Sequence, residues 1–228
     1  MDRMITSAAN PTLKLVRKLL AQKRKRDELG LFVVEGEDLV DAAHAAGIEP
    51  VELLVAGETV EVGLLSELST LAHPARIVGI FRAGDLPRPE REVTLALWRV
   101  GDPGNVGTLL RTADAFGAAL ALSPGCADPF APKALRASAG AIFRVPLVGF
   151  DEVEGRRIAL VAHGGLPLAE VDLSGPVTFL LGAEREGLPE ELAAQSNYLA
   201  TIALPGSAES LNVAAAGAVA LYERSRQV

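Results

Sequence analysis

From Val93 to the C-terminus, apolar runs with the length and composition of strands alternate with runs of helical periodicity. The strand-like runs are VTLALWRV, AALAL, RIALVAH, VTFLLG and YLATIAL, and the helix-like runs are 105–116, PKALRASAG, 189–195 and a long stretch from about Leu211. Strands separated by helices predict parallel pairing with crossover helices, an α/β sheet. Such sheets bind ligands at the carboxyl ends of their strands. Function is therefore expected in the loops 101–105, 182–189 and 204–210.

The preceding part of the chain predicts a smaller α/β domain. Apolar residues at helical spacing indicate an amphipathic helix from Pro11 to about Arg26, with its charges facing solvent. Strand-like LFVVEG, VELLV and RIVGIFR and helix-like EDLVDAAHAAG follow it. The stretch AGDLPRPERE is rich in proline and charge, which is typical of a linker. We therefore predict domains at 1–84 and 93–228, joined by a linker at 85–92.

Composition excludes several classes of protein. With 228 residues, 49% hydrophobic and 22% charged, the chain is expected to fold rather than remain disordered. The longest apolar run, Val213 to Leu221, is far shorter than the roughly 20 residues that cross a bilayer. The N-terminus lacks the features of a secretory signal, so a cytoplasmic location is expected. A single cysteine, Cys126, and three scattered histidines predict neither a disulfide nor a metal site.

The distribution of charge is more informative than the net charge of −7. Residues 1–26 carry eight lysines and arginines and one acid, whereas 27–75 carry eleven acids and no lysine or arginine. This asymmetry suggests that the basic segment docks on phosphates. A solvated helix end, whose cations complement the C-terminal helix dipole, is the alternative.

The loop at 101–105 has two interpretations. Glycine-rich turns before a helix offer backbone N–H groups to anions. However, the chain contains no G-x-G, so the dinucleotide fingerprint and the glycine-rich loop of Rossmann methyltransferases are both missing. Asn105 would also serve as a helix N-cap, and Arg111 with Asp114 as an i,i+3 pair.

The other two loops are similarly ambiguous. Glu184 follows an apolar strand and is either an exposed loop residue or a group that orients a ligand, with Gly182 and Gly187 allowing close backbone approach. Ser210 stands where an N-cap is expected, but capping does not explain Asn212 in the first turn, because asparagine is a poor helix former. Gly217 in the following alanine-rich helix suggests close packing, against the sheet or a second copy.

Taken in order, three segments resemble the motifs of the SpoU (TrmH-like) branch of the SPOUT RNA methyltransferases: NVGTLLRTADAFGA, LLGAEREGLP and IALPGSAESLNVAAAGAVALYE. The intervening GCADPFAPKALRASAGAIFRVP is also similar to the family, so the resemblance runs from Glu92 to the C-terminus. Residues 5–40, ITSAANPTLKLVRKLLAQKRKRDELGLFVVEGEDLV, also resemble the small substrate-binding domain that precedes the catalytic domain in many members, including those acting on ribosomal RNA.

The resemblance implies a parallel α/β domain with a deep trefoil knot, a homodimer, S-adenosylmethionine as methyl donor and a ribose 2′-hydroxyl of RNA as acceptor. Large-subunit ribosomal RNA is the favoured substrate. Transfer RNA, or a non-catalytic RNA-binding or ribosome-assembly role, are the alternatives. The implied catalytic residues are Asn105, Arg111, Glu184, Ser210 and Asn212, and the implied cofactor contacts are Ala162, Gly182, Gly187, Ile202, Leu204 and Leu211. Gly206 stands where relatives often have a bulkier apolar residue.

Two roles follow from charge. A guanidinium stays protonated in proteins, so Arg111 cannot be a general base. Our hypothesis is that Arg111 clamps a neighbouring phosphate and stabilises the developing alkoxide, while a phosphate oxygen or water takes the proton. In the basic segment, we predict that Lys23, Arg24, Lys25 and Arg26 contact the RNA backbone and position it without reading bases.

Overall fold

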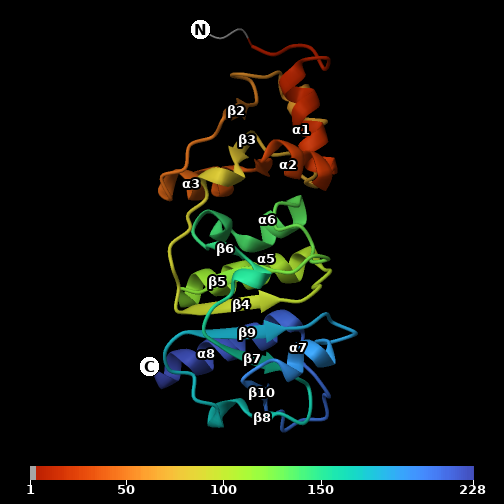
Figure 1. Cartoon of the computed structure of the whole chain (residues 1–228). Helices are drawn as coiled ribbons and strands as arrows, with labels where there is room; N and C mark the ends of the chain where they lie inside the picture. The colour runs from red at the N-terminus through yellow and green to blue at the C-terminus, as the bar shows by residue number, and fades with distance from the viewer. Residues whose placement is uncertain (1–3) are drawn as a thin grey trace. The chain divides into compact units, whose positions relative to one another are not determined.

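The computed structural model describes residues 4–228 and contains two compact units, each with its own sheet (Figure 1). The first unit comprises the chain up to Leu86 together with Asp128–Arg144, and the second comprises Pro87–Ala127 and Val145–Val228. The segment Asp128–Arg144, which lies beyond the predicted linker in sequence, therefore packs with the N-terminal part of the chain. No helix within residues 4–228 is long and apolar enough to cross a membrane.

The first unit is built on a three-stranded antiparallel sheet in which β3 lies between β1 and β2. All three strands coincide with predicted runs. The elements of this unit are α1 (Pro11–Ala21), α2 (Lys23–Leu29), β1 (Leu31–Glu35), α3 (Glu37–Ala45), β2 (Glu52–Val55), α4 (Val62–Ser66), β3 (Ile77–Arg82), the 3-10 turn η1 (Ala83–Asp85), α6 (Pro132–Ser138) and η2 (Ala141–Phe143).

Two apolar clusters hold this unit together. Leu13, Val16 and Leu19 of α1 are fully buried and share a core with residues of all three strands. The later segment contributes Phe130 and Phe143, whose rings lie 4.7 and 6.0 Å from the ring of Phe32 on β1. Aromatic pairs at such separations stabilise a core beyond the area they bury. These contacts explain why 128–144 belongs to this unit.

The predicted single helix from Pro11 to Arg26 is wrong, because the chain breaks it at Gln22. Gln22 has an extended backbone (φ −127°, ψ 109°), so α1 ends at Ala21 and α2 starts afresh at Lys23. The break lets Arg26 turn back, and its guanidinium donates to the carbonyl oxygens of Leu19 and Leu20. Carbonyls in the last turn of a helix lack intrahelical partners, so Arg26 caps α1.

The second unit is a seven-stranded parallel sheet in the order β6-β5-β4-β9-β7-β10-β8. The predicted α/β class and parallel pairing are confirmed. The elements are β4 (Val93–Leu97), α5 (Pro103–Phe116), β5 (Ala119–Leu122), β6 (Leu147–Gly149), η3 (Phe150–Glu152), β7 (Arg156–Leu160), β8 (Leu166–Pro167), η4 (Leu168–Glu170), β9 (Val177–Leu181), α7 (Glu190–Ala194), β10 (Tyr198–Thr201) and α8 (Val213–Gln227).

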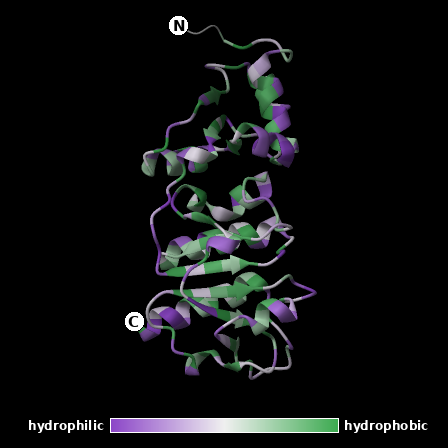
Figure 2. Ribbon diagram, in the orientation of Figure 1, coloured by the Kyte–Doolittle hydropathy of each residue, from purple (hydrophilic) through white to green (hydrophobic). Residues whose placement is uncertain are grey.

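The central strands β4 and β9 are apolar along most of their length and are buried on both faces (Figure 2). On one face, Gly217 of α8 is so close to Leu109 of α5 that an added Cβ would lie 2.5 Å from the leucine Cδ2. On the other face, Phe150 packs over Ala96 and Leu180. The tight packing expected at Gly217 is thus made against α5 and the sheet.

Candidate functional site

The strand order brings the three expected loops to one edge of the sheet. Because all strands are parallel, the segments that follow β4, β9, β7 and β10 emerge on the same side. β9 lies between β4 and β7, so the loop 182–189 has neighbours on both flanks. This central position makes that loop the wall between two cavities.

A chain of hydrogen bonds joins the three motifs. Asn105 Nδ2 donates to Glu184 Oε1 at 2.8 Å, and Asn212 Nδ2 donates to Asn105 Oδ1 at 3.1 Å. The backbone N–H of Ala214 donates to Asn212 Oδ1 at 2.8 Å. Since a backbone N–H can only donate, it fixes the orientation of both amides and leaves Glu184 as the final acceptor. Residues 107 positions apart in sequence therefore form one ordered polar chain.

The helix caps differ from the prediction. Asp102, not Asn105, caps α5, and its Oδ1 accepts from the Asn105 N–H at 3.0 Å. Asn212, not Ser210, caps α8. In both helices the cap frees another polar group: Asn105 turns its side chain toward Glu184, and Ser210 remains in the exposed loop before the helix. The sequence Asp-Pro before α5 is itself a helix-start signal that identifies Asp102.

The first cavity, of about 570 Å³, lies beyond the carboxyl ends of β7, β9 and β10. Its size is within the range of small-molecule sites. All six residues predicted to contact a cofactor line it, namely Ala162, Gly182, Gly187, Ile202, Leu204 and Leu211. Glu184, Ser210 and Asn212 also line it, together with the acids Glu186 and Glu209, which the sequence had not singled out. We call this the donor cavity.

The shape of the donor cavity depends on glycine at 182. A Cβ at this position would lie 2.5 Å from the carbonyl oxygen of Gly187 and closer still to the Gly187 carbonyl carbon and the Leu188 nitrogen. Gly187 has φ +67°, and its N–H donates to Ala183 O at 2.9 Å. The loop thus folds tightly back on the end of β9 and turns its backbone toward the cavity.

A second cavity, of about 760 Å³, opens on the other flank of the same loop. It is lined by Arg99, Gly101, Asp102, Asn105, Gly125, Ala183, Glu184, Arg185, Glu186 and Asn212. The hydrogen-bonded chain of Asn105, Glu184 and Asn212 therefore faces this cavity, and two of its members also face the donor cavity. We call the second space the acceptor cavity.

Arg111 lies outside both cavities. It is six residues beyond Asn105 on α5, which corresponds to about 9 Å along the axis and a rotation of about 240°. Its side chain is exposed and makes no hydrogen bond or ion pair within residues 4–228. Within one copy of the protein, the cavities therefore bring together Asn105, Glu184, Ser210 and Asn212, whereas Arg111 lies apart from them.

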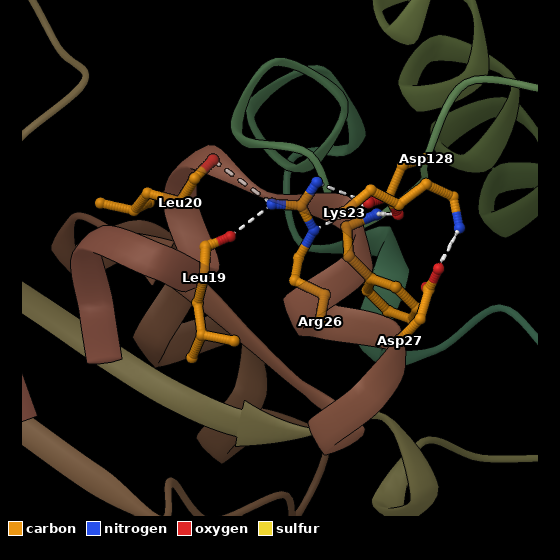
Figure 3. A network of polar contacts seen from close by, with 7 residues as sticks. Leu19, Leu20, Lys23, Arg26, Asp27 and Asp128 are labelled. Atoms are coloured by element: carbon orange, nitrogen blue, oxygen red, sulfur yellow. Dashed lines mark hydrogen bonds and ion pairs between the residues drawn. The ribbon is translucent and has the colours of Figure 1, made fainter. Parts of the chain in front are cut away.

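The basic segment is more ordered than predicted. Lys23 pairs with Asp27 and Lys25 with Glu28, each at 2.8 Å, and Arg24 is exposed. Figure 3 shows the exception, Arg26, whose guanidinium is paired with Asp128 at 2.7 Å with both side chains about 6–7% exposed. The expectation that Arg26 faces solvent is wrong, because its partner, 102 residues away in sequence, draws it into the interior.

Comparison with known proteins identifies the family. Residues 92–222 match the family model described as the SpoU rRNA Methylase family. The chain belongs to this family. Residues 10–80 match the MRM3-like substrate binding domain, so both units of this SpoU family member have counterparts among known domains. Among residues 4–228, no group of three or more histidines, cysteines or acids is placed to hold a metal ion.

Several relatives cover nearly the whole SpoU chain. The 23S rRNA (guanosine(2553)-2′-O)-methyltransferase RlmP of Bacillus subtilis is 31% identical, over 96% of this chain and 98% of its own. The 23S rRNA (uridine(2479)-2′-O)-methyltransferase of Streptomyces viridochromogenes is 33% identical, over 99% and 92%. A crystal structure of an AdoMet-bound rRNA methyltransferase from Sinorhizobium meliloti matches with a TM-score of 0.87 and 33% identity, over 99% of this chain and 98% of that one.

Proposed function

We propose that this SpoU family protein transfers a methyl group from S-adenosylmethionine to a ribose 2′-hydroxyl of RNA. The observation that carries the proposal is the hydrogen-bonded chain of Glu184, Asn105 and Asn212, which stands at the boundary between two cavities. A transfer reaction needs two bound reactants whose reacting atoms meet at one place. This arrangement provides a space on each side of one polar wall.

The donor cavity fits S-adenosylmethionine. Ile202, Leu204 and Leu211 offer apolar walls for an adenine ring, and the folded-back loop at Gly182 and Gly187 brings backbone polar groups to the same space. When bound, this cofactor supplies an electrophilic methyl group on a positively charged sulfonium. Glu184, Glu186 and Glu209 give the cavity the negative charge that suits such a cation. The S. meliloti relative carries the same cofactor in its crystal structure.

The polar chain suits the acceptor hydroxyl. Asn105 and Asn212 are held in one orientation by the α8 backbone, so they present fixed dipoles with little reorganisation. Ser210 lines the donor side and can hydrogen-bond to either reactant. These residues position the hydroxyl and exclude competing orientations. The proton of the hydroxyl leaves to a phosphate oxygen or water, since the Arg111 guanidinium cannot accept it.

Large-subunit ribosomal RNA is the substrate that the comparisons support best. Relatives whose names specify 23S rRNA cover the chain almost end to end. A structural neighbour whose name concerns methylation of C/U34 on tRNA covers only 59% of this chain. The remaining 41% of this chain, which that tRNA-related neighbour does not cover, is about as long as the first unit. We therefore propose that the first unit selects ribosomal RNA and that the protein works in the cytoplasm, where this RNA is assembled.

We propose that the protein acts as a homodimer through its second unit, which we expect to contain the trefoil knot of the family. A dimer would reconcile the proposed phosphate clamp with the position of Arg111 outside both cavities of its own chain, because Arg111 of one copy would then serve the site of the other. Exposed apolar side chains on α5 and α8, those of Phe116, Val219 and Tyr222, offer surface for such a contact. Sedimentation equilibrium tests this directly, and a monomer at micromolar concentration would contradict it.

For the first unit, we propose that Lys23, Arg24 and Lys25 contact RNA phosphates, with Arg26 serving instead to hold them in place. Each phosphate contact contributes about one unit to the dependence of log affinity on log salt. Replacing the three by glutamine should flatten that slope by two to three units. An unchanged slope would locate the docking surface elsewhere.

The experiment that tests the proposed activity measures transfer of labelled methyl groups from S-adenosylmethionine to 23S rRNA and to tRNA. We expect incorporation into 23S rRNA at a ribose 2′-oxygen, and a loss of at least tenfold in Asn105→Ala, which breaks the polar chain. Incorporation into tRNA alone would show that the substrate is tRNA and not ribosomal RNA. No incorporation into either RNA, with RNA binding intact, would favour the non-catalytic role.

A further inference from the structure

Arg99 has an unusual backbone. It follows the end of β4 and has φ +52°, in the left-handed region. Within residues 4–228 only one other non-glycine residue, Ala139, has a positive φ. This conformation is costly for a residue with a Cβ and is seldom used by arginine. Residues held in such conformations tend to cluster at functional sites, because the strain persists only where something else requires it.

The surroundings hold the Arg99 backbone but leave its charge unpaired. Its N–H donates to Ser123 Oγ at 2.9 Å. Its Cγ and Nε lie 3.4 Å from the position that a Cβ of Gly125 would occupy, so the arginine side chain runs alongside Gly125. The guanidinium itself is exposed and has no hydrogen bond or ion pair with a described residue. Within the described residues, the guanidinium therefore makes no polar contact that would offset the cost of the left-handed backbone at Arg99.

The position of Arg99 in the wall of the acceptor cavity indicates what its guanidinium could bind. Arg99 lines this cavity together with Asn105, Glu184 and Asn212. Its charged lining also includes Asp102, Arg185 and Glu186, so acids outnumber arginines. RNA phosphates that entered this space would meet three carboxylates and two guanidiniums, so the positions of the two cations would determine where the phosphates lie.

We propose that Arg99 is a substrate-binding residue that holds the RNA phosphate on the 3′ side of the methylated nucleotide. The inference rests on the proposed function. A 2′-hydroxyl and its 3′-phosphate are attached to adjacent ribose carbons, so placing the hydroxyl at Asn105 brings that phosphate into the same cavity. A guanidinium binds a phosphate through two parallel hydrogen bonds, which fixes direction as well as distance. Arg99 thereby sets which way the strand runs past the polar chain.

Replacement of Arg99 separates this role from a structural one. Arg99→Gly removes the guanidinium and also relieves the backbone strain, so the thermal midpoint should rise by about 2 °C. Arg99→Ala removes the guanidinium and keeps the strain, so its midpoint should stay near that of the wild type. Both variants should raise the KM for 23S rRNA about tenfold and lower the salt dependence of RNA binding by about one unit. The affinity for S-adenosylmethionine should not change.

The matched control is Arg226→Ala, which removes an exposed arginine of the same unit that lines neither cavity. It should leave the KM for 23S rRNA unchanged. Three results would overturn the inference: a wild-type KM in Arg99→Gly and Arg99→Ala, a lowered thermal midpoint in Arg99→Gly, or a weakened affinity for S-adenosylmethionine. If the wild-type protein methylates no RNA, the proposed function fails and not the assignment of Arg99 alone, so the two failures are distinct.

Discussion

Replacing Gly182 by alanine should block the donor cavity without unfolding the second unit. The added Cβ would lie 2.5 Å from the Gly187 carbonyl oxygen, whereas ordinary contact begins at 3.4 Å, so the loop has to move by about 1 Å. Overpacking of this kind costs about 1–3 kcal/mol. If the loop relieves the strain by opening, the described shape becomes a minor state, and the apparent Kd for S-adenosylmethionine rises by the inverse of its population. The expected increase is about 5–150-fold.

Isothermal titration with S-adenosylmethionine measures this Kd, and circular dichroism melting checks that the variant folds. Gly206→Ala is the matched control, because nothing lies within 4 Å of the position its Cβ would take. The control should bind the cofactor within about twofold of wild type. A folded Gly182→Ala variant with wild-type affinity would refute the reasoning that the tight loop at Gly182 shapes the cofactor site.

Three further changes have defined outcomes. Arg26→Ala leaves a buried carboxylate without its partner and should destabilise the protein to urea by about 3–5 kcal/mol, whereas Arg24→Ala, at an exposed site, should stay within about 0.5 kcal/mol. The Arg111→Lys variant should lose most of its turnover, while its Kd for S-adenosylmethionine should stay close to the wild-type value. Near-normal turnover would contradict the phosphate clamp. A hydrogen bond from Arg156 lowers the pKa of Asp172 well below the usual aspartate value of about 3.9, so the stabilisation it brings is present above that pH and is lost as the pH falls. The thermal midpoint of Asp172→Asn should therefore lie below that of wild type at pH 7, with a gap that narrows below about pH 4.

The parallel sheet could be predicted because its central strands are strongly apolar and sit between helices of clear period. β4 and β9 are buried on both faces, and such strands are visible as continuous apolar runs. β6 and β8 were missed, since segments of three and two residues are too short to carry a pattern. The starts of α5 and α8 were each displaced by two residues, because several polar residues before these helices compete for the cap, whereas α1, α3 and α6 begin at the predicted residues.

The polar chain could be predicted only through the resemblance to the SpoU family. Asn105, Glu184 and Asn212 are each ambiguous alone, and their contacts cross up to 107 sequence positions. Arg26 was misplaced for the same reason, because burial of a cation depends on a distant acid. Arg99 carries no sequence signal at all, since a left-handed backbone is expected of glycine and not of arginine. The domain limits at 84 and 93 and the chemical roles of the site residues stay predictions.

The most direct test of RNA ribose methylation is to map 2′-O-methylated nucleotides in total RNA from the source cells with and without the gene. We expect a specific nucleotide of 23S rRNA to lose its 2′-O-methyl group in the deletion strain and to regain it on expression of the wild-type chain but not of Asn105→Ala. An unchanged set of ribose methylations in ribosomal RNA would contradict the proposed function.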